Sequence, residues 1–438
     1  MTSSDLETLL HAVAEAWSVP GAQLCLTQKG TSHFAVYGHA NSATQAPVTP
    51  HTRFQLGSTT KPMVSWLAHR LAEQGELDLN APISRLLPDV QLPSSSNETD
   101  ISCRMLMSHQ SGLCGDAFLD LGNDFAAERR LAEASSKMPM IHPPGDDVSY
   151  CNFGYVLLGL ILERISGRHW TSLFHDQITD ALISTTIDPW PDFAATQNLA
   201  VGHADGAPVS RTSLAASNSA AGTTLIGTAR DLSRFGELVL ESFNADAPMS
   251  AVSVKAMTTP SRWLAPNERG LGFGEGLMVF RTDPLVFGHD GLTIGQQAYL
   301  RIFPETGATL AYLGNGGDMR SASAALFSAL AESTGTELLP PTYSDALESD
   351  IESTSFHRPN ASIEIETRAT GRTLSIVNHE DWAIDLYGAR EGPFNLTSLE
   401  GGGVGYFKPS SATPYRLHVS PQAAYLGMRR YNRFEGCA

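Results

Sequence analysis

A short stretch near residue 60 constrains the fold and the chemistry of this chain more than any other feature. Residues 54–62 read Phe-Gln-Leu-Gly-Ser-Thr-Thr-Lys-Pro, and the apolar residues that follow, as far as Ala72, repeat at helical spacing. Gly57 stands where a tight turn into this helix is needed. In a helix that begins near Ser58, residues three positions apart share a face, so the amine of Lys61 can reach the Ser58 hydroxyl.

A serine hydroxyl becomes a good nucleophile only when a neighbouring base accepts its proton. Lysine can be that base where burial or a nearby cation lowers its pKa. The alternative interpretation is an ordinary helix start, in which Ser58 is a cap and Lys61 lies in solvent. Ser-x-x-Lys is short enough to occur by chance, so the catalytic interpretation needs support from the rest of the chain.

The composition indicates a protein of ordinary globular type. The chain has 438 residues, of which 42% are hydrophobic, and this suits about two domains. No apolar run reaches the ~18 residues of a membrane-spanning helix, and the N-terminus lacks the features of a signal peptide. We therefore expect a soluble, cytoplasmic protein. The net charge of −17 disfavours nucleic acid and anionic membranes as partners.

The cysteines and histidines show no spacing typical of a metal site. An odd number of cysteines without paired spacing favours small apolar residues in a reducing compartment. We predict neither a metal nor a cofactor, and we expect the partner to be a small-molecule or peptide substrate. The pattern makes no prediction of oligomeric state. The cysteines are Cys25, Cys103, Cys114, Cys151 and Cys437.

The first 340 residues mix helical and strand-like patterns. Helical spacing predicts helices at 4–17, 58–72, 103–109, 124–136, 155–167, 170–182 and 228–240. Strand-like runs at 22–27 and 33–38 predict a hairpin that turns at Lys29 and Gly30, and further runs occur at 273–281, 295–303 and 308–314. Residues 80–100 are rich in Pro, Ser and Asn and indicate a surface loop.

The character of the sequence changes at Pro340-Pro341. After an acidic stretch come six or seven short strand-like runs at about ten-residue spacing, separated by turn residues. This pattern predicts two domains, one over 1–340 and a small antiparallel barrel or sandwich over 341–438. The runs are 362–366, 373–377, 383–387, 394–396, 404–407, 415–419 and 425–428.

Tyr150 and Asn152 are the first of two later stretches that combine with Ser58. They follow a Pro-Pro-Gly turn and precede an apolar helix. A tyrosine phenolate held by cations can act as a general base, and an asparagine amide can hydrogen-bond both a lysine and a substrate carbonyl. The alternative is a core tyrosine followed by a helix-capping asparagine.

His289, Asp290 and Gly291 form the second stretch, just before the strand-like run at 295–303. A polar residue at a strand edge, followed by glycine, lets backbone N–H groups approach a substrate. We therefore expect Asp290 and Gly291 to bind substrate. The alternative is a strand-entry turn with an exposed histidine.

Ser-x-x-Lys, Tyr-x-Asn and His-x-Gly occur in this order, with about ninety residues between the first two. The arrangement resembles the penicillin-recognising serine enzymes, which include class C β-lactamases, DD-peptidases and the related esterases and D-aminopeptidases. It covers roughly residues 5–335 and implies a β-lactamase/DD-peptidase-like α/β (α+β) domain, an antiparallel sheet flanked by helices. The supporting stretches are 54–58, 106–113, 144–145, 149–155 and 270–274.

The resemblance implies a role for each residue of the three stretches. Ser58 would be the nucleophile, Lys61 and Tyr150 a coupled base, Asn152 the group that aligns Lys61 and the substrate, and His289 a group that polarises the pocket or binds the acyl part. The backbone N–H groups of Ser58 and Leu292 are expected to hold the oxyanion.

His289 stands where β-lactamases of this class carry the lysine of Lys-Thr-Gly. The histidine form is common among the esterase and D-aminopeptidase-like relatives. It argues against β-lactam hydrolysis, because the Lys-Thr pair helps to hold the β-lactam carboxylate. The C-terminal module resembles the lipocalin-like domain of D-amino-acid-specific peptidases. The layout is also similar to that of the penicillin-binding-protein-type thioesterases, which release and cyclise nonribosomal peptides in the cytoplasm.

These observations lead us to expect a serine hydrolase that acts through a Ser58 acyl-enzyme on amide or ester bonds of a peptide-like substrate. An acyltransferase or peptide macrocyclase would use the same acyl-enzyme, and a binding protein without activity is a third class. The C-terminal module is either a lid over the active site or a dimerisation element. The glycines at 401–403 favour the lid, since they suit a mobile loop tip.

Overall fold

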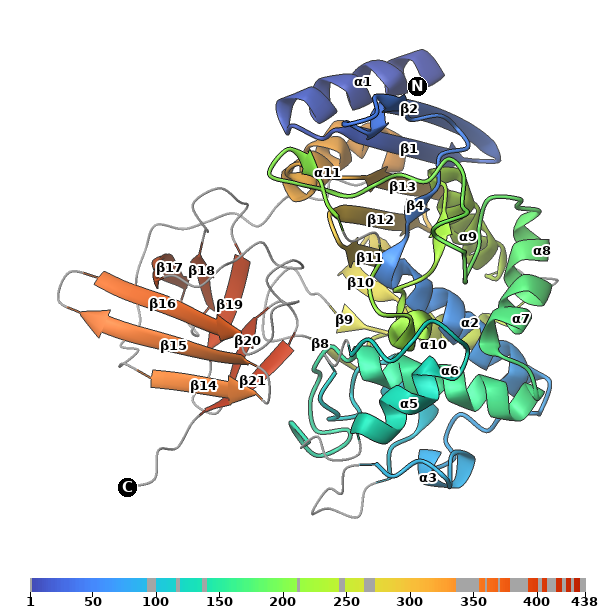
Figure 1. The fold of residues 1–438 in the computed structure, drawn as a ribbon, viewed down its shortest axis with the longest axis vertical. Helices are drawn as coiled ribbons and strands as arrows, with labels where there is room; N and C mark the ends of the chain where they lie inside the picture. Colours follow the sequence, from blue (N-terminus) through green and yellow to red (C-terminus); the bar gives the residue numbers. More distant parts are fainter. Residues whose placement is uncertain are drawn as a thin grey trace.

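In the computed structural model, a nine-stranded antiparallel sheet forms the framework of residues 2–335 (Figure 1). The structure describes residues 2–92, 100–115, 119–135, 140–210, 213–243, 249–263 and 272–335, and eight strands between 354 and 433. The sheet order is β3-β2-β1-β13-β12-β11-β10-β9-β8. The strands are β1 Gly21–Gln28, β2 Thr31–Asn41, β3 Ala46–Pro47, β8 Arg262–Trp263, β9 Gly272–Phe273, β10 Met278–Thr282, β11 Leu285–Thr293, β12 Gln296–Phe303 and β13 Ala308–Gly314.

Helices cover both faces of the sheet, which explains why its middle strands are apolar on both sides. On one face α1 (Ser3–Ala16) and α11 (Met319–Ala329) pack together against the sheet. On the other face lie α9 (Ala229–Glu241) and, beyond it, α2 (Thr60–Glu73) and α6 (Asn152–Ser166), within the larger hydrophobic core. The predicted antiparallel sheet flanked by helices is confirmed.

Shorter elements connect these layers. They are β4 Phe54–Gln55, β5 His203–Ala204, β6 Ala207–Pro208 and β7 Ile226–Gly227; helices α3 Ile83–Leu86, α4 Cys103–Met107, α5 Ala127–Ala134, α7 Trp170–Phe174, α8 Asp180–Leu182, α10 Ala251–Thr258 and α12 Ala331–Thr334; and the turns η1 Gly57–Thr59, η3 His175–Thr179 and η4 Ala216–Ala221.

Two local predictions are confirmed by backbone geometry. The hairpin of β1 and β2 turns at Lys29 and Gly30, whose φ angles of 51° and 75° match the turn type that suits the twist of paired strands. Helix α6 is buried from Asn152 to Leu162, and it ends where Gly167 adopts a left-handed φ of 70°.

The strand pattern around residues 273–293 differs from expectation. The predicted strand 273–281 is broken into β9 and β10 by a bend at 274–277, where Gly276 has a φ of 107° and packs so closely against Ser65 that a Cβ atom would not fit. His289 and its two neighbours lie inside β11 rather than before a strand. The glycines at 288 and 291 interrupt the apolar alternation by which a strand is recognised.

Eight strands between residues 354 and 433 pair in sequence order, and the first pairs with the last to close a barrel. They are β14 Thr354–Arg358, β15 Ala361–Arg368, β16 Gly371–Asn378, β17 Pro393–Glu400, β18 Val404–Phe407, β19 Tyr415–Val419, β20 Ala423–Leu426 and β21 Arg429–Arg433. The predicted runs did not include β14 and β21. The predicted run at 383–387 and the domain boundary near 340 lie outside the described residues.

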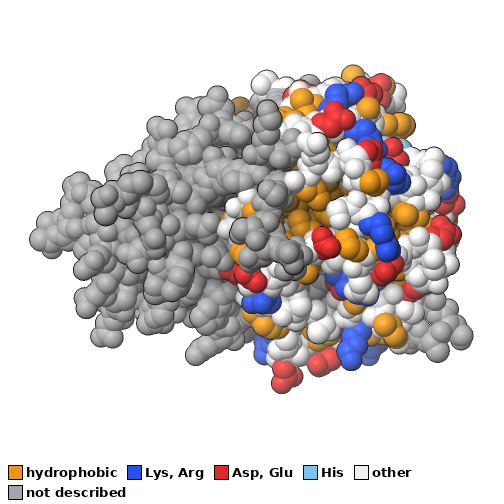
Figure 2. All heavy atoms as spheres, turned by 90° about the horizontal axis from the view of Figure 1, so that it is seen from below, with side chains coloured by type: hydrophobic (Ala, Val, Ile, Leu, Met, Phe, Trp, Pro, Cys, Tyr) orange, Lys and Arg blue, Asp and Glu red, His pale blue; other side chains and the backbone are white. Residues whose placement is uncertain are grey.

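Four of the cysteines are buried and are not in disulfides. Burial raises the pKa of the Cys25 thiol to about 11 and that of Cys103 to about 12, so both stay protonated as small core residues. Among the described residues, no helix is both long and apolar enough to cross a bilayer. Figure 2 shows acidic, basic and apolar side chains interspersed over the described part of one face.

Candidate active site

Ser58 lies in the 3-10 turn η1, directly before α2. Two side chains hold this turn: the Thr59 hydroxyl donates to the Leu56 carbonyl oxygen (2.8 Å), and the Thr60 hydroxyl donates to the Gly57 carbonyl oxygen (2.7 Å). Thr59 and Thr60 are buried, whereas Ser58 keeps partial exposure. The turn therefore presents the serine hydroxyl at the surface of an otherwise buried segment.

Glycines from three segments allow close backbone approach around Ser58. Gly57 has a φ of 54°, a left-handed conformation that suits glycine. A Cβ atom at Gly291 would overlap the carbonyl oxygen of Leu56, and one at Gly222 would overlap the carbonyl oxygen of Gly57. Side chains at these positions would force apart η1, β11 and the segment after η4.

The backbone N–H groups of Ser58 and Leu292 come close together in this arrangement. A Cβ atom at Gly57 would lie 2.8 Å from the Leu292 nitrogen, and one at Gly291 would lie 3.2 Å from the Ser58 nitrogen. The Ser58 N–H also stands at the start of a helix, where backbone donors lack partners within the helix. Two backbone donors beside a serine hydroxyl are suited to binding a developing oxyanion.

Lys61 is fully buried, and its amine points at the serine. The Nζ atom donates to Ser58 Oγ (2.9 Å) and to the carbonyl oxygen of Ala221 at the end of η4 (2.6 Å). It lies 5.0 Å from the centroid of the Tyr150 ring and 5.4 Å from that of Tyr155. The structure thus brings Lys61 and Tyr150 together beside Ser58.

Tyr150 and Asn152 enter the site at the beginning of α6. Both are buried, with 4% and 5% of their surfaces exposed. Asn152 is the first residue of the helix, and its backbone N–H donates to the Gly115 carbonyl oxygen (3.1 Å). The helix cap is Cys151, whose Sγ accepts from the Gly154 N–H (3.2 Å).

His289 points from β11 towards Tyr150, with 6.3 Å between the ring centroids. Its Nδ1 lies 2.7 Å from the Asp290 carbonyl oxygen; because a carbonyl can only accept, Nδ1 carries the proton. Burial, together with the charge of Lys61, lowers the pKa of His289 to about 3. The ring is therefore neutral at physiological pH, and Nε2 is a buried acceptor that has no hydrogen-bond partner within the described residues.

Asp290 does not fit the expected role in substrate binding. Successive side chains of a strand point to opposite faces, so Asp290 points away from the face that carries His289 and Gly291. Its carboxylate pairs with Arg301 of β12 (2.5 Å), and the Arg301 guanidinium lies 3.7 Å from the centroid of the Phe280 ring. Asp290 therefore stabilises the sheet on the side away from Ser58, whereas Gly291 lies against the Ser58 turn.

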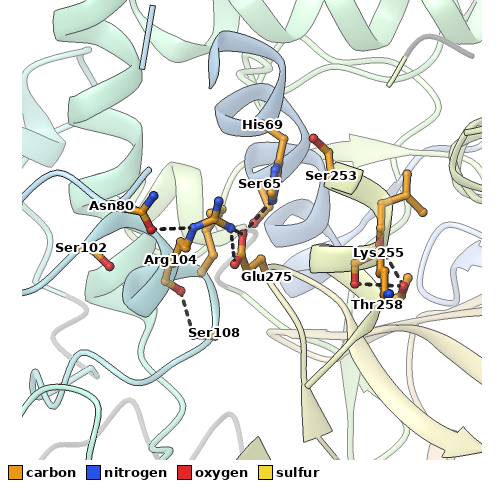
Figure 3. Close-up of polar contacts among 12 residues, drawn as sticks. Ser65, His69, Asn80, Ser102, Arg104, Ser108, Ser253, Lys255, Thr258 and Glu275 are labelled. Carbon is orange, nitrogen blue, oxygen red and sulfur yellow. Dashed lines mark hydrogen bonds and ion pairs between the residues drawn. The ribbon is translucent and has the colours of Figure 1, made fainter. Parts of the chain in front are cut away.

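A partly buried ionic network supports α2, the helix that carries Lys61 (Figure 3). Glu275, from the bend between β9 and β10, accepts two hydrogen bonds from Arg104 of α4 (2.6 and 2.7 Å) and lies 3.0 Å from His69 Nε2 of α2. Burial alone would raise the pKa of Glu275, but the hydrogen bonds from His69 and Arg104 lower it. Arg104 Nε also donates to Asn80 (3.0 Å).

Sequence reasoning missed three contributors to the site. Ala221 acts through its carbonyl oxygen, for which a sequence carries no side-chain signal. Glu128 is fully buried and accepts from the Ser219 hydroxyl (2.6 Å) and the Ala220 N–H (2.9 Å), which fixes the turn that carries Ala221. Glu128 lies within the predicted helix 124–136, and its sequence context gave no sign that it is buried. The third contributor, His109, lies against Tyr150.

The comparisons with known proteins agree with this geometry. A family model described as Beta-lactamase matches residues 8–332, well over half of the chain. The chain belongs to the Beta-lactamase family. Penicillin-binding protein 4 of Amycolatopsis lactamdurans is 30% identical over 312 residues, which cover 68% of this chain and 81% of that protein. The predicted resemblance to penicillin-recognising serine enzymes is confirmed.

Solved structures similar to this Beta-lactamase family chain extend the comparison. The crystal structure of SurE aligns with a TM-score of 0.76 and 25% identity over 99% of both chains, and SurE has also been solved with D-Leu. D-amino acid amidase from Ochrobactrum anthropi SV3 aligns with a TM-score of 0.63 and 22% identity over 75% of this chain and 99% of its own. At that identity the amidase shows a shared fold alone.

No group of three or more His, Cys, Asp or Glu side chains that could hold a metal ion occurs among the described residues. The functional groups gathered around Ser58 are an amine, a phenol, an imidazole and backbone amides. These groups are suited to acyl transfer through a serine nucleophile.

Proposed function

We propose that the protein is a serine hydrolase that cleaves amide or ester bonds of a peptide-like substrate through an acyl-enzyme on Ser58. The observation that carries this proposal is the 2.9 Å contact between Lys61 Nζ and Ser58 Oγ, in a site where the backbone nitrogens of Ser58 and Leu292 lie close together. A nucleophile, a base within hydrogen-bond reach and an oxyanion site are the three requirements for this chemistry.

In the first step Ser58 Oγ forms a bond to the substrate carbonyl carbon, and its proton passes to the Lys61/Tyr150 pair, which acts as a coupled unit. The N–H groups of Ser58 and Leu292 stabilise the oxyanion, each contributing about 3 kcal/mol. The bond to the leaving amine or alcohol then breaks, and Tyr150 returns the proton to that group. Asn152 aligns Lys61 and the substrate. Water attacks the acyl-enzyme and regenerates Ser58.

His289 bears on the substrate class. Because its ring is neutral, it has no positive charge to pair with a substrate carboxylate, and its Nε2 offers an acceptor instead. A neutral acceptor suits an amide N–H or a hydroxyl group of the substrate. This supports amides and esters of D-aminopeptidase or esterase type over β-lactams as substrates.

The similarity to SurE supports the same choice, since SurE has been solved with D-Leu and aligns over nearly the whole of both chains. We therefore propose D-amino acid residues as the acyl part of the substrate. An acyltransferase or macrocyclase of thioesterase type would form the same Ser58 acyl-enzyme and would differ only in the attacking group, an amine in place of water.

The test is intact-mass analysis after incubation with a fluorophosphonate, a fluorescent β-lactam, p-nitrophenyl esters and paired D- and L-amino acid amides. We expect an adduct on Ser58, with turnover of esters or D-amides. Ser58→Ala should abolish the adduct, whereas Ser4→Ala, an exposed serine of α1, should not. Lys61→Ala should slow acylation by several orders of magnitude. An unchanged rate in Tyr150→Phe would show that the base is assigned wrongly.

The fate of the adduct separates the alternatives. Turnover in water alone indicates a hydrolase, and an adduct that clears only after an amine is added indicates a transferase. If no probe forms an adduct, the protein is a binding protein on this fold and the proposal is wrong.

We propose further that the C-terminal domain, whose barrel strands lie between 354 and 433, is a lipocalin-like lid that shapes access to Ser58. The alignment with the amidase supports a C-terminal domain added to the catalytic domain, because 75% of this chain aligns with 99% of the amidase. Deletion of 341–438 should broaden substrate selectivity; unchanged selectivity would count against a lid and favour dimerisation, which light scattering would detect.

A further inference from the structure

His109 contacts both chain neighbours of Tyr150. It follows α4 with a φ of 60°, a left-handed conformation that is uncommon outside glycine. Its carbonyl oxygen accepts from the Ser149 N–H (2.9 Å), and its Nδ1 accepts from the Cys151 N–H (3.0 Å). One residue thus holds the backbone immediately before and immediately after the tyrosine.

The His109 ring also packs directly on the tyrosine. Its centroid lies 4.2 Å from that of Tyr150, with 32° between the ring planes. Phe273 of β9 meets the same imidazole edge-on at 4.7 Å, and Tyr155 of α6 lies at 5.6 Å. His109 is 1% exposed, so the imidazole is enclosed among aromatic rings and has little freedom to move.

The segment that carries Tyr150 needs such support. Cys151 has extended backbone angles (φ −134°, ψ 104°), and residues 148–151 precede α6 without belonging to a strand. Backbone N–H groups in a buried, irregular segment require partners outside regular secondary structure. Two of these N–H groups donate to His109, one to its carbonyl oxygen and one to its ring.

We propose that His109 is a positioning residue that holds the Tyr150 phenol in place relative to Lys61 and Ser58. This inference rests on the proposed role of Tyr150 in proton transfer. Because Nδ1 accepts the Cys151 N–H, the proton of the neutral imidazole lies on Nε2. His109 does not touch the reacting atoms; it acts by fixing the backbone and the ring plane of Tyr150, whose centroid lies 5.0 Å from Lys61 Nζ.

The experiment compares His109→Ala and His109→Asn in the full-length protein. Asparagine tolerates a left-handed backbone and places Oδ1 near the position of Nδ1, so it keeps the acceptor for the Cys151 N–H. We expect His109→Ala to lower the acylation rate by about 10- to 100-fold, as misplacement of a reacting group does. His109→Asn should stay within about fivefold of wild type, because it keeps the hydrogen bond to the Cys151 N–H and loses only the ring contact with Tyr150. KM for a p-nitrophenyl ester should change little in either variant.

The decisive measurement is a double-mutant cycle with Tyr150→Phe. If His109 acts through the phenol, His109→Ala should cause no further loss once the phenol is absent. An equal loss in both backgrounds, or a wild-type rate in His109→Ala, would overturn the positioning role. A wild-type rate in Tyr150→Phe alone would instead refute the proposed function of Tyr150, so the two failures are distinguishable.

Two controls separate positioning from stability. His109→Gly relieves the left-handed backbone yet lacks the acceptor, so it should match His109→Ala in rate even if it is more stable. His203→Ala removes another buried histidine, which is hydrogen-bonded to Asn315 and Ser42, and it should lower the unfolding temperature without lowering the acylation rate. A similar rate loss in His203→Ala would mean that the His109 effect is a general consequence of instability.

Discussion

Gly291→Ala tests the assignment of the Leu292 N–H as an oxyanion donor. A Cβ atom at position 291 would overlap the Leu56 carbonyl oxygen and lie 3.2 Å from the Ser58 nitrogen, so β11 must move away from the Ser58 turn. That movement displaces the Leu292 N–H relative to the Ser58 N–H. Loss of one oxyanion donor costs about 10²- to 10³-fold in rate, and we expect a decrease of this size in the acylation rate.

Gly288→Ala provides a matched control on the same strand. A Cβ atom there would overlap the Leu300 carbonyl oxygen of β12, a comparable conflict directed away from Ser58. Overpacking of this kind costs about 1–3 kcal/mol, so both variants should lose similar stability in urea denaturation. Only Gly291→Ala should lose acylation.

The assay is the second-order rate constant for labelling by a fluorophosphonate, measured at a temperature where both variants are folded. The phosphonyl oxygen occupies the oxyanion site, so the rate reports on its donors without knowledge of the natural substrate. Equal labelling rates in the two variants, at equal stability, would show that the Leu292 N–H does not stabilise the oxyanion.

Two further predictions follow from charged groups outside the catalytic set. Glu275→Gln should destabilise the protein by about 1–3 kcal/mol at pH 7, since a charged hydrogen-bond acceptor is lost. The folded-state pKa of Glu275 is held below its ordinary value of 4.5, so its contribution to the free energy of unfolding is present above that pH and lost as the pH falls through the folded pKa. The difference in unfolding free energy between wild type and Glu275→Gln, measured by urea denaturation, should therefore be smaller at pH 4 than at pH 7. An equal difference at the two pH values would refute the ionic account. Asp290→Asn should lower stability through Arg301 while leaving the acylation rate unchanged; a large rate loss in a stably folded variant would restore Asp290 to the site.

Local patterns predicted most of the helices and the first hairpin, because each depends on contacts between residues close in the chain. Left-handed angles at Lys29 and Gly30 are a property of the turn itself, and the apolar run of α6 identifies a buried helix without further context. Proximity of Ser58 to Lys61 follows in the same way from helical spacing, and the structure places the two side chains 2.9 Å apart.

Asp290 illustrates where local reasoning fails. It was expected to bind substrate as part of a polar stretch at a strand edge that ends in glycine, yet strand alternation directs its side chain to the opposite face and to Arg301. The alternation of the strand was hidden because two of its positions are glycines. Gly288 lies too close to the backbone of β12 for a side chain, and Gly291 lies too close to the Ser58 turn. The neighbours that demand those glycines are distant in the chain.

Residue identity and short spacing were enough to predict most of the helices, the nucleophile motif and the family to which the chain belongs. Three features of the site became visible only in the folded chain: Ala221 accepts from Lys61, His109 holds both neighbours of Tyr150, and His289 is neutral. Each of these is a consequence of burial and of contacts between residues far apart in the chain, and such contacts are set by how the helices and the sheet pack together.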